Sequence, residues 1–104
     1  MCGICSILFR DQNRAVESWR IERMKTSIAH RGPDDAGDYF DGNLAFGHRR
    51  LSIIDLQPSG HQPMSDATGR FWIIYNGEIY NYVELRSSLA VTGVDFRSHS
   101  DTEV

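Results

Sequence analysis

CGICSILF, residues 2–9, determines how the fold begins, because this run is apolar and rich in residues that favour strands. It predicts a buried first strand. Cysteine is small enough for the preceding Met1 to be removed, which would leave Cys2 with a thiol and a free α-amine on one carbon. An α-amine titrates at about 7.7–8.0, so it can accept a proton near neutral pH. The run therefore predicts either a nucleophilic thiol with its own base or an ordinary buried cysteine.

The composition limits the class of protein. With 104 residues the chain is one small domain or a piece of a larger one, and 40% hydrophobic with 24% charged residues is typical of globular proteins. A net charge of −3 argues against binding to a nucleic-acid backbone, and no apolar run is long enough to span a membrane. Both cysteines lie within the first five residues and no signal-peptide pattern precedes them. We therefore expect a cytoplasmic protein without a disulfide framework.

Periodicity predicts the elements of the first half. Residues 15–30 suit an amphipathic helix that ends at Gly32-Pro33, and Asp41-Gly42-Asn43 between residues 38–40 and 44–46 is a strong hairpin signal. Residues 50–55 read as another strand, and residues 57–69 as an exposed loop. The apolar positions of this helix are Val16, Trp19, Ile21, Met24 and Ile28. Trp19 is therefore expected in the core.

The second half begins with the most hydrophobic predicted strand, residues 71–75, in which Trp72 is also expected in the core. The strand ends at Asn76-Gly77, a dipeptide that tolerates positive φ and predicts a sharp turn. A second helix should follow Asn81, with Glu84 completing a capping box and Gly93 ending it. Its expected buried side chains are Val83, Leu85 and Leu89.

The last five residues repeat the capping-box spacing at Ser100 and Glu103, and this spacing predicts another helix. A native C-terminus rarely falls one turn into a helix whose start is so well specified. We therefore expect residues 1–104 to be a partial domain whose remainder is missing.

Four motifs stand in order along the chain, followed by Asp101 in a Ser-Asp-Thr-Glu context. The motifs are Cys2-Gly3-Ile4, His30-Arg31-Gly32-Pro33-Asp34, His48-Arg49-Arg50-Leu51-Ser52-Ile53 and Asn76-Gly77-Glu78-Ile79-Tyr80-Asn81. Together they resemble the glutamine amidotransferase domain of class II, the N-terminal-nucleophile type. RGPD at residues 31–34 makes the chain most similar to the glutaminase domain of asparagine synthetase.

The resemblance implies a role for each matching residue. Cys2 would attack the side-chain amide of glutamine, and the Asn76 side chain with the Gly77 N–H would hold the oxyanion. Arg50 would bind the α-carboxylate of glutamine, since an arginine fork matches a carboxylate, while Arg49 would be a solvated neighbour. The complete implied glutamine-binding set is Arg50, Leu51, Ser52, Ile53, Ile54, Asn76, Gly77, Glu78 and Asp101, with Asp101 and Glu78 near the ammonium group.

The same resemblance implies an α+β fold, the four-layer αββα sandwich of N-terminal-nucleophile hydrolases, of which this chain would be an N-terminal fragment. The implied activity is hydrolysis of glutamine to glutamate and ammonia through a Cys2 thioester, which supplies ammonia for asparagine synthesis from aspartate. The glutaminase part needs no cofactor or metal, whereas ATP and magnesium would belong to a C-terminal synthetase domain. Expected partners are glutamine and that domain, with a homodimer as a further option and without nucleic acid or membrane.

Alternatives stay open at each level. The ammonia acceptor could instead be a sugar or a peptide, or the scaffold could be a non-catalytic interaction domain. Asn76-Gly77 alone is more often a hairpin turn, and an arginine is usually a surface charge. The Cys2-x-x-Cys5 spacing admits a redox or zinc site, but residues three apart in a strand point to opposite faces, so Cys5 is interpreted as a core residue. His30 and His48 are interpreted as structural.

Overall fold

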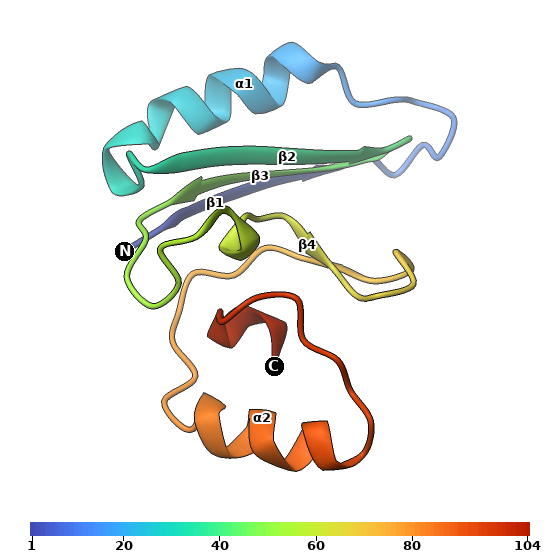
Figure 1. The fold of residues 1–104 in the computed structure, drawn as a ribbon. Helices are drawn as coiled ribbons and strands as arrows, with labels where there is room; N and C mark the ends of the chain where they lie inside the picture. The colour runs from blue at the N-terminus through green and yellow to red at the C-terminus, as the bar shows by residue number, and fades with distance from the viewer.

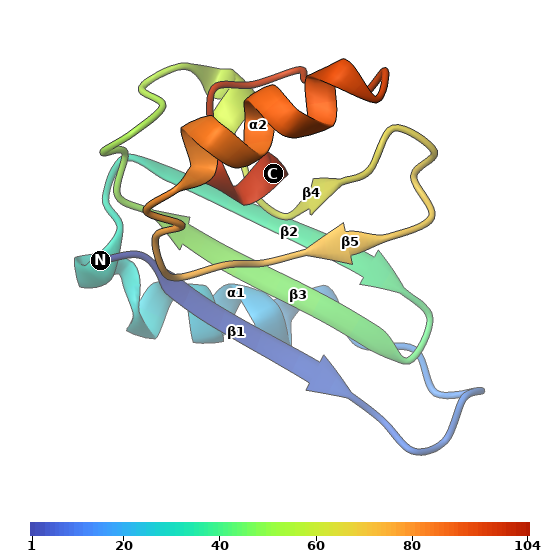
Figure 2. The same ribbon diagram turned by 90° about the horizontal axis from the view of Figure 1, so that it is seen from below.

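A three-stranded antiparallel sheet of order β1-β3-β2 forms the first part of the molecule, and Figure 2 shows its strands side by side. The strands are β1 (Gly3–Leu8), β2 (Asp35–Asp41) and β3 (Leu44–Arg50). The computed structural model describes all residues 1–104 and has an α+β architecture.

The β2–β3 hairpin confirms the predicted turn, although its strands are longer than expected. Gly42 has φ +54°, a conformation that glycine adopts without the steric penalty of a Cβ. Asn43 then fastens the hairpin to the segment after β1, because its side-chain amide donates to the Phe9 carbonyl at 2.7 Å and the Phe9 N–H donates to the Asn43 carbonyl at 2.9 Å. The turn therefore sets the register of the hairpin and also anchors the end of β1.

Helix α1 (Ser18–Ser27) covers one face of this sheet, as Figure 1 shows, and a short 3₁₀ turn (Ala29–Arg31) follows it. Ile21 is fully buried and forms the apolar core with Val16 and Ala45. The placement of Trp19 in the core was wrong, since its side chain is 49% exposed. Trp19 lies two residues, about 200° of helical turn, from Ile21 and so faces the opposite side.

A buried ion pair joins the same helix to the sheet. The Lys25 ammonium lies 2.6 Å from carboxylate oxygens of Asp38 on β2 and Glu22 on α1. Burial lowers the pKa of Lys25, but the hydrogen bonds and charges of the two carboxylates outweigh burial, so its net pKa lies above the ordinary value. Lys25 therefore remains charged at neutral pH although it is buried.

The other face of the sheet is incompletely covered. The prediction that β1 is a fully buried strand was wrong, because Ile4 is 46% and Leu8 is 70% exposed. Only the alternate residues that face α1 are sheltered, as expected when a single layer packs on one side of a sheet.

The second part of the molecule contains a short two-stranded sheet and helix α2 (Tyr82–Val91). The two strands, β4 (Met64–Ser65) and β5 (Trp72–Ile73), pair antiparallel. Residues 50–55 are not a strand as predicted, since the chain leaves the sheet after Arg50. The predicted long strand over residues 71–75 is reduced to β5, in which Trp72 stacks on Tyr39 of β2 with ring centroids 4.0 Å apart.

The predicted exposed loop over residues 57–69 was also partly wrong. It contains a 3₁₀ turn (Pro58–Gly60), and Gln62 and Met64 are buried. A polar, proline-rich composition indicates irregular backbone, but it does not say whether another segment packs over that backbone.

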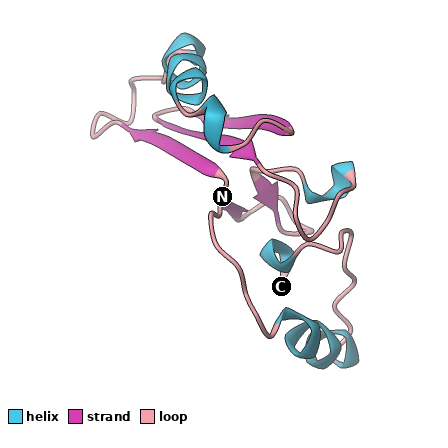
Figure 3. Ribbon diagram, turned by 90° about the vertical axis from the view of Figure 1, so that its left-hand side faces the viewer, coloured by secondary structure: helices cyan, strands magenta, loops and turns pink.

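Helix α2 follows Asn81 and ends before Gly93, whose φ is +94°, as the sequence predicts. The predicted cap is absent, because the Asn81 side chain accepts no hydrogen bond from the helix. The expected buried side is also absent, since Val83 is 55% and Leu85 is 39% exposed. Figure 3 shows α2 at the opposite end of the molecule from α1, far from the sheet.

The C-terminal segment forms a single 3₁₀ turn (Asp101–Glu103) where a helix start was predicted. The Ser100 hydroxyl caps it by accepting from the Thr102 N–H at 3.1 Å. Glu103 does not complete the capping box. Its carboxylate instead accepts from the N–H groups of Arg97 and Ser98, both at 2.7 Å. No helix of the structure has the length and apolarity needed to cross a membrane.

Candidate active site

One pocket of about 300 Å³ opens where the start of β1, the end of β3 and the C-terminal turn meet. The sequence-predicted site residues that line it are Cys2, Arg50, Leu51, Ile53, Ile54, Asn76, Gly77, Glu78 and Asp101. Ser52 is the exception, because it does not line the pocket and its N–H donates to an Asp34 carboxylate oxygen at 2.8 Å. Residues separated by almost the whole chain therefore share one cavity.

The two cysteines occupy different environments. The Cys2 sulfur accepts from the Leu51 N–H at 3.4 Å, and its thiol lies 3.7 Å from the Leu51 carbonyl oxygen. The Cys5 sulfur faces the Gly47 carbonyl at 3.6 Å, and burial raises the pKa of its thiol. Both thiols are free. Only Cys2 lines the pocket.

Arg50, the last residue of β3, is held by backbone carbonyls. Its side chain donates to the carbonyls of Gln57, at 3.0 Å, and Asp55. A guanidinium carries five N–H donors, and the other three have no partner in the chain. Arg50 lines the pocket. Arg49 was predicted to be solvated, but it is half-buried and donates to the Gly32 carbonyl at 3.0 Å. Side chains alternate along a strand, which gives the two arginines different surroundings.

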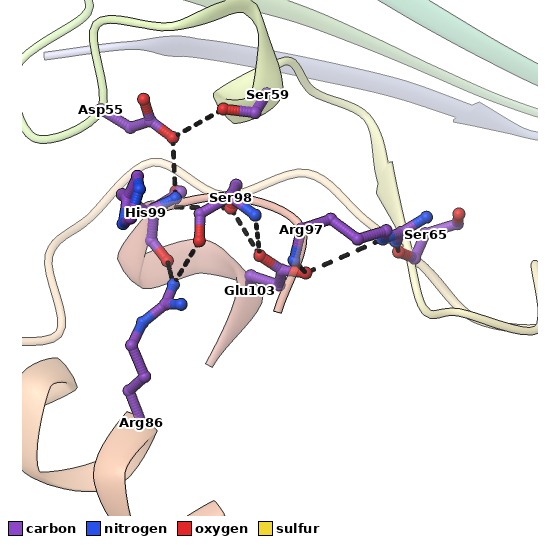
Figure 4. Close-up of polar contacts among 9 residues, drawn as sticks. Asp55, Ser59, Ser65, Arg86, Arg97, Ser98, His99 and Glu103 are labelled. Atoms are coloured by element: carbon purple, nitrogen blue, oxygen red, sulfur yellow. Dashed lines mark hydrogen bonds and ion pairs between the residues drawn. The ribbon is translucent and has the colours of Figure 1, made fainter. Parts of the chain in front are cut away.

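Asp55 is a buried residue that sequence reasoning missed. Its carboxylate accepts from the N–H groups of Gln57 and His99, both at 2.9 Å, and from the Ser59 hydroxyl at 3.1 Å, as Figure 4 shows for Ser59 and His99. Burial alone would raise the pKa of Asp55. The hydrogen bonds and the Arg50 charge outweigh burial, so the net pKa lies below the ordinary value. Asp55 thereby links the loop that holds Arg50 to the segment that carries Asp101.

Asp101 is 5% exposed, and its carboxylate holds the backbone at Ile79. One of its carboxylate oxygens accepts from the Ile79 N–H at 2.8 Å, and the other accepts no hydrogen bond from the chain. Glu78 is exposed on the same pocket. The pocket thus places one fixed cation opposite two carboxylates, a pattern that suits a ligand with both a carboxylate and an ammonium group.

The Asn76-Gly77 segment differs from the predicted turn. Positive φ occurs only at Gly42, Gly69 and Gly93, so Gly77 is not required by backbone conformation. It is required by a close approach, because a Cβ at Gly77 would lie 2.5 Å from the Tyr75 hydroxyl oxygen. Neither the Asn76 side-chain amide nor the Gly77 N–H donates to any group of the chain, and both residues line the pocket. These donors are therefore free to bind a ligand.

No group of three or more His, Cys, Asp or Glu side chains is arranged to hold a metal ion.

Comparison with known proteins shows the family of the chain. A family model described as a glutamine amidotransferase domain matches residues 1–104. The chain belongs to the glutamine amidotransferase domain family. It is 45% identical over 106 residues to asparagine synthetase [glutamine-hydrolyzing] 1 of Bacillus subtilis (strain 168), and 38% identical over 106 residues to asparagine synthetase [glutamine-hydrolyzing] 3 of the same strain. It is also 45% identical over 117 residues to amidase chry2 of Gibberella zeae. Each alignment covers 100% of this chain but 17% of the relative, so this glutamine amidotransferase domain spans about a sixth of the length of these proteins.

Proposed function

We propose that this domain hydrolyses glutamine to glutamate and ammonia at Cys2. The observation that carries the proposal is the shared pocket: a free thiol, unbonded donors at Asn76 and Gly77, and the charges of Arg50 and Asp101 line the same cavity of about 300 Å³. Nucleophile, oxyanion donors and substrate-orienting charges are the components that acyl transfer needs.

The reaction begins once Met1 has been removed and the Cys2 α-amine is free. The amine takes the thiol proton, and the thiolate attacks the side-chain amide carbon of glutamine. The Asn76 amide and the Gly77 N–H stabilise the resulting oxyanion. The C–N bond then breaks as the amine gives the proton to the leaving nitrogen. Ammonia is released, and the acyl group stays bound to Cys2 as a thioester. Water then cleaves the thioester, which releases glutamate and restores the thiol.

The charged residues orient the substrate for this attack. The free N–H groups of Arg50 bind the α-carboxylate of glutamine, and the open oxygen of Asp101, with Glu78 nearby, binds the α-ammonium. Leu51, Ile53 and Ile54 line the wall of the pocket. Ser52 does not line this wall, because its N–H is bound to Asp34.

The relatives suggest where the ammonia goes. Two of them are named glutamine-hydrolysing asparagine synthetases, which supports asparagine synthesis from aspartate in a separate synthetase domain that uses ATP and magnesium. We also propose that residues 1–104 are the N-terminal part of a four-layer αββα sandwich in a cytoplasmic protein, which would cover the exposed side chains of β1 and α2. The name amidase chry2 of one relative keeps a different ammonia acceptor as the alternative.

The decisive experiment is Cys2→Ala in the protein as the cell makes it. We expect complete loss of glutamine-dependent ammonia release, because no other thiol lines the pocket. Cys5→Ala is the matched control and should retain activity. Labelling with a glutamine-mimicking electrophile should modify Cys2 alone. Undiminished ammonia release by Cys2→Ala would refute the proposal, and an unmodified Cys2 in folded protein would favour a non-catalytic interaction domain.

A further inference from the structure

The backbone of Tyr75 is held at its N–H and at its carbonyl by buried side chains. The Tyr75 N–H donates to the Gln62 side-chain carbonyl at 2.6 Å, and the Tyr75 carbonyl lies 3.3 Å from His48 Nε2. His48 is fully buried and Gln62 is 5% exposed. Two side chains from different segments, β3 and the loop before β4, therefore hold the two peptide groups that flank the Tyr75 Cα.

This contact determines which ring nitrogen of His48 carries the hydrogen. A carbonyl oxygen only accepts hydrogen bonds, so Nε2 carries the hydrogen. Nδ1 is buried and has no partner in the structure. Burial lowers the pKa of His48, which agrees with a neutral imidazole. A buried acceptor without a partner in the chain costs stability, and the contact between Nε2 and the Tyr75 carbonyl is the one polar interaction that the His48 ring makes in the structure.

The neighbouring residues explain why the backbone of Tyr75 matters. None of the backbone groups of residues 76–78 makes a hydrogen bond within the chain. The anchors of this segment lie at its two ends, at the Tyr75 backbone and at the Ile79 N–H, which donates to Asp101 at 2.8 Å. The Gln62 amide also donates to the Thr102 hydroxyl at 3.1 Å, next to Asp101. The two anchors are thus connected.

We propose that His48 and Gln62 are positioning residues that clamp the backbone of Tyr75 and so aim the Asn76 amide and the Gly77 N–H at the oxyanion. This inference rests on the proposed glutamine hydrolysis. Oxyanion donors act by being fixed before charge develops, and a free segment of three residues cannot provide that by itself. The clamp supplies the rigidity from two buried side chains, of which Gln62 also lines the pocket and His48 does not.

The test measures kcat and KM for glutamine hydrolysis in His48→Phe and Gln62→Met, made in the protein as the cell makes it. Oxyanion binding acts in the transition state, so we expect kcat to fall about tenfold to hundredfold and KM to change less than about threefold. Alkylation of Cys2 by iodoacetamide, a reaction that needs no oxyanion donor, should keep its rate. His48→Gln restores an amide donor toward Tyr75 and should recover most of kcat.

Matched controls are His61→Phe and Gln12→Met, whose side chains are exposed and do not line the pocket. Unchanged kcat in folded His48→Phe or Gln62→Met, or a rise in KM alone, would overturn the clamp. If His48→Phe does not fold, Gln62→Met decides the question. Ammonia release by Cys2→Ala would refute the glutaminase itself, whereas an inactive Cys2→Ala with fully active clamp variants would refute only the positioning role.

Discussion

At the scale of single residues, the position of Arg50 depends on a residue without a side chain. Gly60 lies in the 3₁₀ turn against the Arg50 guanidinium, and a Cβ there would lie 2.6 Å from the Arg50 Cζ. The guanidinium is a planar group held by two backbone carbonyls, so it cannot shift without losing them. The glycine therefore determines where the guanidinium lies, although Gly60 itself does not line the pocket.

Gly60→Ala should displace this guanidinium and weaken glutamine binding. A hydrogen bond to a charged group contributes about 1.5–3 kcal/mol, so we expect KM for glutamine to rise about tenfold or more, with a smaller effect on kcat. Steady-state assay of ammonia release measures both values. Gly69→Ala is the control, since a Cβ at Gly69 meets nothing within 4 Å and the residue is remote from the pocket. An unchanged KM in Gly60→Ala would show that Arg50 does not bind the substrate.

At the scale of elements, the packing of α1 on the sheet depends on Gly47 of β3. A Cβ at Gly47 would lie 2.7 Å from the Cys5 sulfur, 2.9 Å from Lys25 Cγ and 3.0 Å from Ile21 Cγ2. The backbone of β3 thus approaches the helix closely, and this approach brings the Lys25 ammonium to Asp38.

Gly47→Ala should overpack this interface and reduce the free energy of unfolding by about 1–3 kcal/mol. Chemical denaturation, followed by circular dichroism, measures the change. Gly42→Ala provides the comparison, because its site is open and only the positive φ is strained, at about 1–2 kcal/mol. If the Gly47→Ala variant is as stable as the unmodified chain, α1 does not pack as closely as described.

The elements also show what a sequence can predict. Three signals confined to a few residues were correct: the Gly42 turn, the start of α2 after Asn81 and its end before Gly93. Other signals of this kind failed, since Gly77 has no positive φ and neither predicted capping box is completed. The predicted burial of β1 and α2 failed, because the burial of a strand or a helix depends on another element that packs against it. The motifs brought their residues to one pocket, but nothing near Asp55 or Gln62 in the sequence indicates that they bind His99 and Tyr75, which lie 44 and 13 residues away. Such long-range contacts depend on the tertiary fold.

At the scale of the whole molecule, the buried side chains are mostly polar. Four hydrophobic residues are buried, against eight polar or charged ones, and most of the latter surround the pocket between the sheet and the C-terminal segment. This interface is held by hydrogen bonds, many of them to carboxylates, and not by an apolar core. Figure 4 shows Asp55 and Glu103 accepting from the segment that includes Ser98 and His99. The stability of the molecule should therefore depend on the ionisation of these acids.

Acid should weaken the molecule through Asp55. A carboxyl group whose pKa is lowered by folding contributes stability above its ordinary value, about 3.9 for aspartate, and loses that contribution as pH falls through the lower folded value. We therefore expect the free energy of unfolding to fall as pH drops below about 4.

Asp55→Asn should be less stable at neutral pH and should lose less on acidification, because the variant has no proton to take up at this site. Urea unfolding at a series of pH values measures both effects. Asp41→Asn, at an exposed residue that accepts no side-chain hydrogen bond, should keep the original pH dependence. Parallel curves for Asp55→Asn and the unmodified chain would mean that the Asp55 carboxylate does not hold the two parts together.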